Sequence, residues 1–211
     1  MSGATLRKAC LEGLIFQVER IIAGALDISG MRSPIYTGMQ TSDWVTRKAL
    51  VDIIKDRDAV GNAAIHICCM HNRIDCLEAI IKTGLCDVSL KGQNGFSAAA
   101  YCANMGFDKC LALLIGAGFD VTQEPALVLD AALQGHAAVV DLLLLHGAAV
   151  NPNPNQPLQT PLHLAVLNSN VDAARALING GADVNACNGS QQRPQDCCVT
   201  DACRMLFESP G

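Results

Sequence analysis

The chain has 211 residues, of which 50% are hydrophobic, 4% aromatic and 17% charged, and its formal net charge at pH 7 is −5. An acidic chain has no diffuse basic surface that attracts phosphates, so we do not expect nucleic acid as a direct ligand. The scarcity of aromatic residues favours helices packed through Ala, Leu and Ile over a β-sandwich.

The first sixteen residues, MSGATLRKACLEGLIF, contain no long apolar core followed by a small-residue cleavage site. They therefore do not resemble a secretory signal. The most apolar region, residues 125–150, is interrupted by Asp, Gln and His residues, which predicts a buried helix pair instead of a membrane span. We expect a cytoplasmic or nuclear protein that does not insert into membranes.

Five stretches of the chain share one pattern of small and apolar residues. Their register marks are Gly13, Asn72, Gly106, Gly135 and Ser169. The residues five, eight and nine places after each mark are apolar, which is the spacing of one helical face. The residue four places before each mark is Ala or Cys, small enough for a second helix to pass close. Each copy therefore predicts a helix pair, and copies this short must stack to share a core.

The first copy covers residues 4–28 and is followed by an insertion at residues 29–57, about 26 residues longer than the next junction. Its first half predicts an irregular loop, and Ser42 is placed to cap a helix over residues 43–55. This helix either docks on the stack or is the second half of another, degenerate repeat. A further interpretation is that the loop containing Tyr36, together with the single tryptophan, contacts a partner.

The later copies cover residues 58–89, 92–122, 125–151 and 155–185, and residues 186–211 keep the register as a degenerate C-terminal cap. The junction before the fourth copy is four residues shorter than usual, so we expect its projecting hairpin to be clipped. Asp130 follows it at a position that is apolar in the equivalent copies. Because an unpaired buried carboxylate is costly, we expect Asp130 to be exposed at this junction or hydrogen-bonded.

The fifth copy reads QTPLHLAVLNSNVDAARALINGGADVN and closely resembles the ankyrin repeat signature. Other copies keep fragments of it, including GNAAIHICC and QGHAAVVDLLLLHGAAVN. The resemblance implies an all-α fold: an ankyrin-repeat solenoid of stacked helix-turn-helix units with short β-hairpin junctions. It also implies a single domain over residues 1–211.

The signature residues have structural explanations. Thr160 is placed to cap a helix and Pro161 suits its first position, where a missing N–H costs nothing. The resemblance implies that His66 and His163 tie neighbouring loops together by hydrogen bonds. Glycines that follow each second helix predict helix ends with positive φ. These are Gly84, Gly118, Gly147 and Gly181.

Of the eleven cysteines, Cys68 and Cys102 share one slot of the repeat, and Cys76 and Cys110 share another, where cysteine substitutes for alanine. Together with the odd count and the lack of a secretory signal, this indicates reduced thiols. Cys197, Cys198 and Cys203 form a cluster without the spacing or the nearby histidine of a zinc site, so we expect no metal and no cofactor. Cys86 and Cys187 are the candidates for a redox-sensing thiol. A cysteine-dependent enzyme would centre on Cys69 and His71, although no orienting carboxylate lies beside this pair.

The preferred hypothesis is a non-catalytic protein-protein interaction module, such as a scaffold, adaptor or inhibitor, that is monomeric on its own. A thiol-based redox sensor or cysteine-dependent enzyme is the alternative. The resemblance places partner contacts in the concave groove, at the last turn of each first helix, and at the hairpin tips. The matching positions are Ala59, Val60, Asn62, Met70, His71, Gln93, Asn94, Phe96, Asn104, Met105, Leu133, Gln134, Gln159, Leu167 and Asn168.

Overall fold

The computed structural model of the protein describes residues 3–26, 44–152 and 159–208. The chain divides into two compact units, Met1–Tyr101 and Cys102–Gly211. Each unit is built from helices, and no strand occurs among the described residues. This confirms the predicted all-α fold class.

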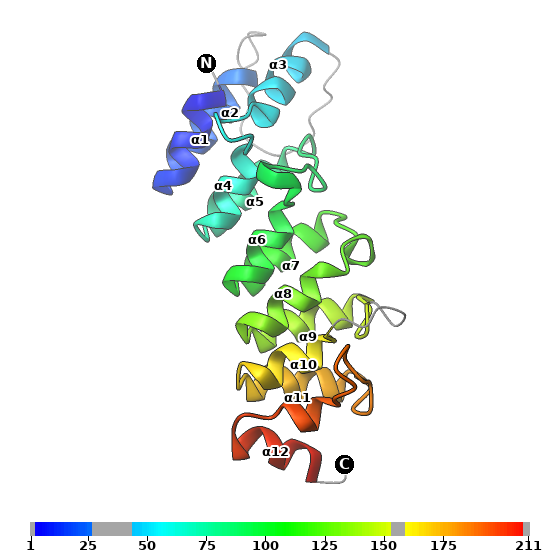
Figure 1. Cartoon of the computed structure of the whole chain (residues 1–211). Coiled ribbons are helices and arrows are strands. Elements are labelled where there is room, and N and C mark those ends of the chain that lie inside the picture. Colours follow the sequence, from blue (N-terminus) through cyan, green and yellow to red (C-terminus); the bar gives the residue numbers. More distant parts are fainter. Residues whose placement is uncertain (1–2, 27–43, 153–158, 209–211) are drawn as a thin grey trace. The chain divides into compact units, whose positions relative to one another are not determined.

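In the first unit, helices pair and the pairs then stack. The pair α1 and α2 packs on the pair α4 and α5, with α1 beside α4 and α2 beside α5 (Figure 1). First helices thus line up with first helices and second helices with second helices. The bounds are α1 Gly3–Glu12, α2 Ile15–Leu26, α3 Trp44–Lys55, α4 Ala64–Met70, α5 Ile74–Lys82 and the 3₁₀ turn η2 Gln93–Gly95.

The second unit repeats this arrangement. Helix α8 lies beside α10, and α9 lies between α7 and α11, with which it also packs. Helix α6, Ala98–Met105, begins in the first unit and ends in the second. The other bounds are α7 Asp108–Gly116, η3 Val121–Gln123, α8 Ala126–Gln134, α9 Ala137–Leu145, α10 Pro161–Leu167, α11 Val171–Asn179, η4 Pro194–Cys197 and α12 Asp201–Glu208.

The predicted apolar face forms the core. The residues five and eight places after each mark are all buried, as are the small residues four places before it. The residues nine places after the mark are half-buried in four of the five copies, with Ile22 the buried exception. Burying one leucine such as Leu143 contributes about 1.5–3 kcal/mol, so the shared face supplies most of the stability of each unit.

The junctions between helix pairs are turns and short 3₁₀ segments. The expected β-hairpins are reduced, in the described residues, to one isolated bridge between Lys91 and Ser97. Side-chain oxygens close these turns locally and leave no extended chain to pair. At the shortened junction, an Asp120 carboxylate oxygen accepts hydrogen bonds from the Thr122 N–H at 3.0 Å and its hydroxyl at 2.6 Å, and α8 begins soon afterwards.

The insertion contributes α3, which packs against α1 and α2 through an apolar face. Leu50, Ile53 and Ile54 on this helix are buried. The described helix begins at Trp44, while Asp43, Ser42 and Tyr36 lie outside the described residues. Docking of this helix on the first pair agrees with the structure, and its origin as a degenerate repeat stays a prediction.

The C-terminal segment begins as another helix pair. The turn at residues 188–192 has the same hydrogen bonds as the turn at 58–62, since the side-chain oxygens of Asn188 and Asp58 each accept from the N–H groups two and four residues on. The first helix is then shortened to η4, and the second is α12, in which Cys203 is buried. That this segment is a degenerate C-terminal cap stays a prediction.

No described helix combines the length and the apolar character that crossing a membrane requires.

Candidate partner-binding surface

The two signature histidines are structural. Nδ1 of His66 accepts from the Ala63 N–H at 3.1 Å, which leaves Nε2 to donate to the Leu90 carbonyl at 2.9 Å. Because Nδ1 accepts a hydrogen bond, the ring is neutral, and burial lowers the pKa of His66 in the same direction. His66 therefore ties the start of α4 to the following loop, as expected.

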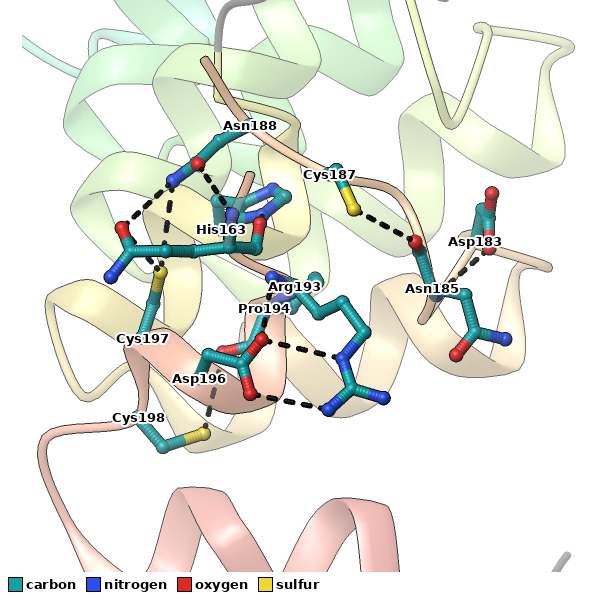
Figure 2. Close-up of polar contacts among 11 residues, drawn as sticks. His163, Asp183, Asn185, Cys187, Asn188, Arg193, Pro194, Asp196, Cys197 and Cys198 are labelled. Atoms are coloured by element: carbon teal, nitrogen blue, oxygen red, sulfur yellow. Dashed lines mark hydrogen bonds and ion pairs between the residues drawn. The ribbon is translucent and has the colours of Figure 1, made fainter. Parts of the chain in front are cut away.

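His163 plays the same part at the start of α10. The Thr160 hydroxyl oxygen accepts from the His163 N–H, and Pro161 occupies the first turn, so the predicted cap is confirmed. Nε2 of His163 lies 2.9 Å from the Gln192 carbonyl, beside the Asn188 turn (Figure 2). The imidazole therefore joins the last complete helix pair to the C-terminal segment.

A second set of hydrogen bonds holds the opposite ends of the first helices. At three of the five marks, the side chain of the residue directly after the mark reaches back to a carbonyl at the end of the preceding first helix. Arg73 donates to Leu11, and Nε2 of His136 lies 3.0 Å from the Asn104 carbonyl. Asn170 donates to the carbonyls of Ala132 and Leu133 at 3.0 and 2.9 Å. Sequence reasoning missed this set, although the polar residue that directly follows the mark in three of the copies was visible.

These hydrogen bonds explain why glycine recurs at the marks. A Cβ atom on Gly106 would lie 2.5 Å from His136, and one on Gly135 would lie 2.7 Å from Asn170. Both glycines also have positive φ, at 77° and 83°. Glycine therefore lets the donor side chain of the next helix pair cross the helix end. The four glycines that follow second helices also have positive φ, as predicted.

The described cysteines are free and mostly buried. The pKa of Cys68 is raised, mainly by a hydrogen bond with Cys10 and to a lesser extent by burial. The pKa of Cys110 is raised in the same way, mainly by a hydrogen bond with Cys102 and then by burial. Burial raises the pKa of Cys86 to about 12, which disfavours the thiolate that redox sensing requires. Cys86 is half-buried and Cys187 is exposed, and a redox role for either thiol stays a prediction.

The proposed enzyme pair is not a pair in the structure. Cys69 is fully buried, whereas His71 is exposed beyond the end of α4. A nucleophile must be reached by its substrate and hydrogen-bonded to its base, and Cys69 meets neither condition here. The hypothesis of a cysteine-dependent enzyme at this position loses its basis.

The C-terminal thiols take part in the packing of the C-terminal segment. The Asn188 amide lies 3.8 Å from the Cys197 sulfur, and the Cys198 thiol donates to the Pro194 carbonyl at 3.6 Å (Figure 2). Burial raises the pKa of both thiols. Among the residues that the structure describes, no group of three or more His, Cys, Asp or Glu side chains has a metal-binding arrangement.

In the first unit, the predicted loop positions form two tips. Val60 is 53% exposed in one turn, and Phe96 is 48% exposed in the other. Ala59 and Asn94 are exposed at the same turns, and Gln93 is half-buried. The Phe96 ring packs on Tyr101, with ring centroids 6.1 Å apart.

Asn62 differs from the other predicted contacts because it is only 1% exposed. Its side-chain oxygen accepts from the Gln93 N–H at 2.9 Å and lies 3.5 Å from the Tyr101 hydroxyl. The amide holds the two turns together from inside. We therefore correct this assignment: Asn62 positions the loop tips and does not itself reach a partner.

The predicted helix-end positions lie at the surface in both units. In the first unit, His71 is exposed and Met70 is half-buried. In the second unit, α6, α8 and α10 each end in one exposed apolar residue and one exposed amide, and Gln159 is exposed before α10. The apolar members are Met105, Leu133 and Leu167, with 51%, 39% and 36% of their surface exposed, and the amides are Asn104, Gln134 and Asn168.

Two half-exposed positions one turn earlier complete this surface. Asp130 on α8 and Leu164 on α10 lie three and four residues before the exposed pair of their helix, hence on the same face. The equivalent residues in the first unit are Ile67 and Tyr101, both half-buried. We name the eight residues of the second unit the inner strip: Asn104, Met105, Asp130, Leu133, Gln134, Leu164, Leu167 and Asn168. The helical spacing of these positions could have identified them from the sequence.

Stacked helix pairs that are fastened at both ends of their first helices define a helical repeat protein, a class whose folds present extended surfaces for binding. A family model described as ankyrin repeats in three copies matches residues 43–125 and 122–188, from the start of α3 to the Asn188 turn. The chain belongs to the ankyrin repeat family. The resemblance predicted from the signature is confirmed.

The similar proteins include one that is named as an inhibitor. The chain is 28% identical over 145 residues to the mouse B-cell lymphoma 3 protein homolog, a match that covers 65% of the chain and 32% of that protein. It is 26% identical over 163 residues to the NF-kappa-B inhibitor cactus of Drosophila yakuba, covering 74% and 33%. The matches therefore span about a third of each relative.

Solved structures show the same fold. The ankyrin repeat domain of Bcl-3, described as a unique member of the IkappaB protein family, has a TM-score of 0.65 at 21% identity, covering 97% of this chain and 98% of that one. The ankyrin repeat protein EF0377 has a TM-score of 0.72 at 20% identity and full coverage of both chains.

Proposed function

We propose that the chain is a non-catalytic module that binds a partner protein through the inner strip and the loop tips around Val60 and Phe96. The observation that carries this proposal is the recurrence, at the ends of α6, α8 and α10, of one exposed apolar side chain beside one exposed amide. Exposed apolar residues at equivalent positions provide contact area, and the amides can hydrogen-bond a partner's polar groups.

The supporting hydrogen bonds strengthen this proposal. The carbonyls of Asn104 and Leu133, two residues of the inner strip, accept from His136 and Asn170 of the next helix pair. A surface fixed in this way loses little conformational entropy when a partner binds. Cys69 is buried and the pKa of the half-buried Cys86 is raised, so neither thiol gives comparable support to the thiol alternative.

We also propose a masking role, as an inhibitor or adaptor in the cytoplasm or nucleus. The support is similarity to a protein named as an NF-kappa-B inhibitor and to the Bcl-3 homolog, over the repeat region alone. In this proposal the chain acts as a monomer and covers a surface that its partner needs for another interaction.

The test is affinity capture from cell lysate with the intact chain and with a variant carrying Phe96→Ala and Met105→Ala. The expected result is loss of specific partners from the variant. Leu145→Ala is the matched control, because this side chain is 80% exposed but lies on α9, outside the proposed surface. Recovery of the same partners by all three proteins would exclude the proposed surface.

A further inference from the structure

Asp130 is the one charged residue of the inner strip. It lies in the middle of α8, on the face that also carries Leu133 and Gln134, and α8 packs beside α10. The equivalent position on α10 is the apolar Leu164. A carboxylate therefore lies within a surface that is otherwise made of apolar and amide side chains.

The fold does not use this carboxylate. Burial raises the pKa of Asp130 and is the only cause of the shift, and none of the described residues donates a hydrogen bond to it or pairs with it. Other aspartates close turns by accepting from backbone N–H groups two residues on. These are Asp58, Asp87, Asp120 and Asp183. Asp130 is half-buried, but its carboxylate closes no turn of this kind.

We propose that Asp130 determines which partner the inner strip accepts, by pairing with an arginine or lysine that a partner segment carries between apolar side chains. This inference rests on the proposed function. A partner lying over Leu133 and Leu167 would exclude water from the carboxylate, and an uncompensated charge would then oppose binding. A cation at this point restores the lost interaction, whereas an apolar or acidic residue there is rejected.

Arginine fits this site better than lysine. Its guanidinium can donate two parallel hydrogen bonds to one carboxylate and is less strongly hydrated than an ammonium group. The flanking amides, Gln134 and Asn168, are both exposed and can bind backbone groups of the same segment. The expected motif is therefore one arginine with apolar neighbours on both sides.

The experiment selects random peptides of about 16 residues, displayed on phage, against the intact chain. We expect the enriched peptides to share one basic residue flanked by apolar residues. A selected peptide should bind Asp130→Asn about tenfold more weakly, because close charge pairs in interfaces contribute at least about this factor. Replacing the basic residue of the peptide by alanine should cause the same loss, and both changes together should cause little more.

The matched control is Asp141→Asn, which neutralises an exposed carboxylate on α9 and should leave peptide affinity unchanged. The peptide substitution requires no change in the protein, so it tests the pairing even if a variant folds poorly. Peptides that need Leu133 and Leu167 but no basic residue would overturn the role of Asp130 and leave the proposed surface intact. Failure to enrich peptides, or affinity insensitive to Leu133→Ala and Leu167→Ala, would count against the surface itself and so against both proposals.

Discussion

Replacing His163 by alanine should loosen the C-terminal segment from the rest of the second unit. The variant loses the hydrogen bond to the Gln192 carbonyl and the contact of Nδ1 with the Thr160 hydroxyl at 2.9 Å. Each hydrogen bond contributes about 1 kcal/mol net, and the cavity left by a fully buried imidazole adds about 1–2 kcal/mol. We expect the free energy of unfolding to fall by about 3 kcal/mol.

Urea denaturation followed by circular dichroism measures the total loss, and amide hydrogen exchange shows where it occurs. The amides of η4 and α12 should lose protection first, because the Gln192 carbonyl then retains only its bond from the Asn188 N–H. His146→Ala is the control, since this exposed histidine at the end of α9 should change stability by less than about 0.5 kcal/mol. A loss no greater than in the control, with unchanged exchange in α12, would refute the fastening role of His163.

Three further outcomes can be measured on the isolated protein. Gly135→Ala should destabilise it by about 1–2 kcal/mol in urea denaturation because φ is 83°, whereas Gly116→Ala, in open space at the end of α7, should not destabilise it. In the native protein a thiol reagent should modify exposed Cys187 rapidly and buried Cys68 only on unfolding; mass spectrometry of early adducts on Cys68 would contradict this. Burial raises the pKa of Asp130 in the folded state above its ordinary value of 3.8. Between the unfolded-state and folded-state pKa values the folded chain therefore binds more protons than the unfolded chain, and the protein loses stability as the pH rises through this range. Asp130→Asn should therefore gain stability relative to the wild type between pH 3 and neutrality, and a pH-independent difference would exclude the assigned shift.

The helix pairs were predictable because their signals are local and repeated. Each copy places apolar residues one helical turn apart, and the small residue four places before the mark, such as Cys102 or Ala131, must face another helix. The Thr160 cap was predictable for a related reason, since it involves atoms only three residues apart, whereas the role of His163 was implied by the family resemblance. Errors in one copy are offset by agreement among the others.

The surface was harder to predict because exposure depends on partners distant in sequence. Asn62 occupies a loop position that resembles a contact, but its amide is drawn inward by the Gln93 N–H, 31 residues later. Asp130 was expected to be exposed or hydrogen-bonded, and it is instead half-buried without a described donor. The reduced hairpins have a similar origin, because side-chain oxygens compete with strand pairing at each turn.

Two helix pairs reach toward both of their neighbours. From the pair α4 and α5, His66 extends forward to Leu90 and Arg73 extends back to Leu11. From α10 and α11, His163 and Asn170 do the same toward Gln192 and Leu133. Hydrogen bonds that point in opposite directions from the two ends of a first helix resist both sliding and hinging between that helix pair and its neighbours. The surface of each unit is therefore already fixed when the chain folds. If a partner binds there as proposed, it should dock without rearranging the backbone, at a rate limited by diffusional encounter and orientation.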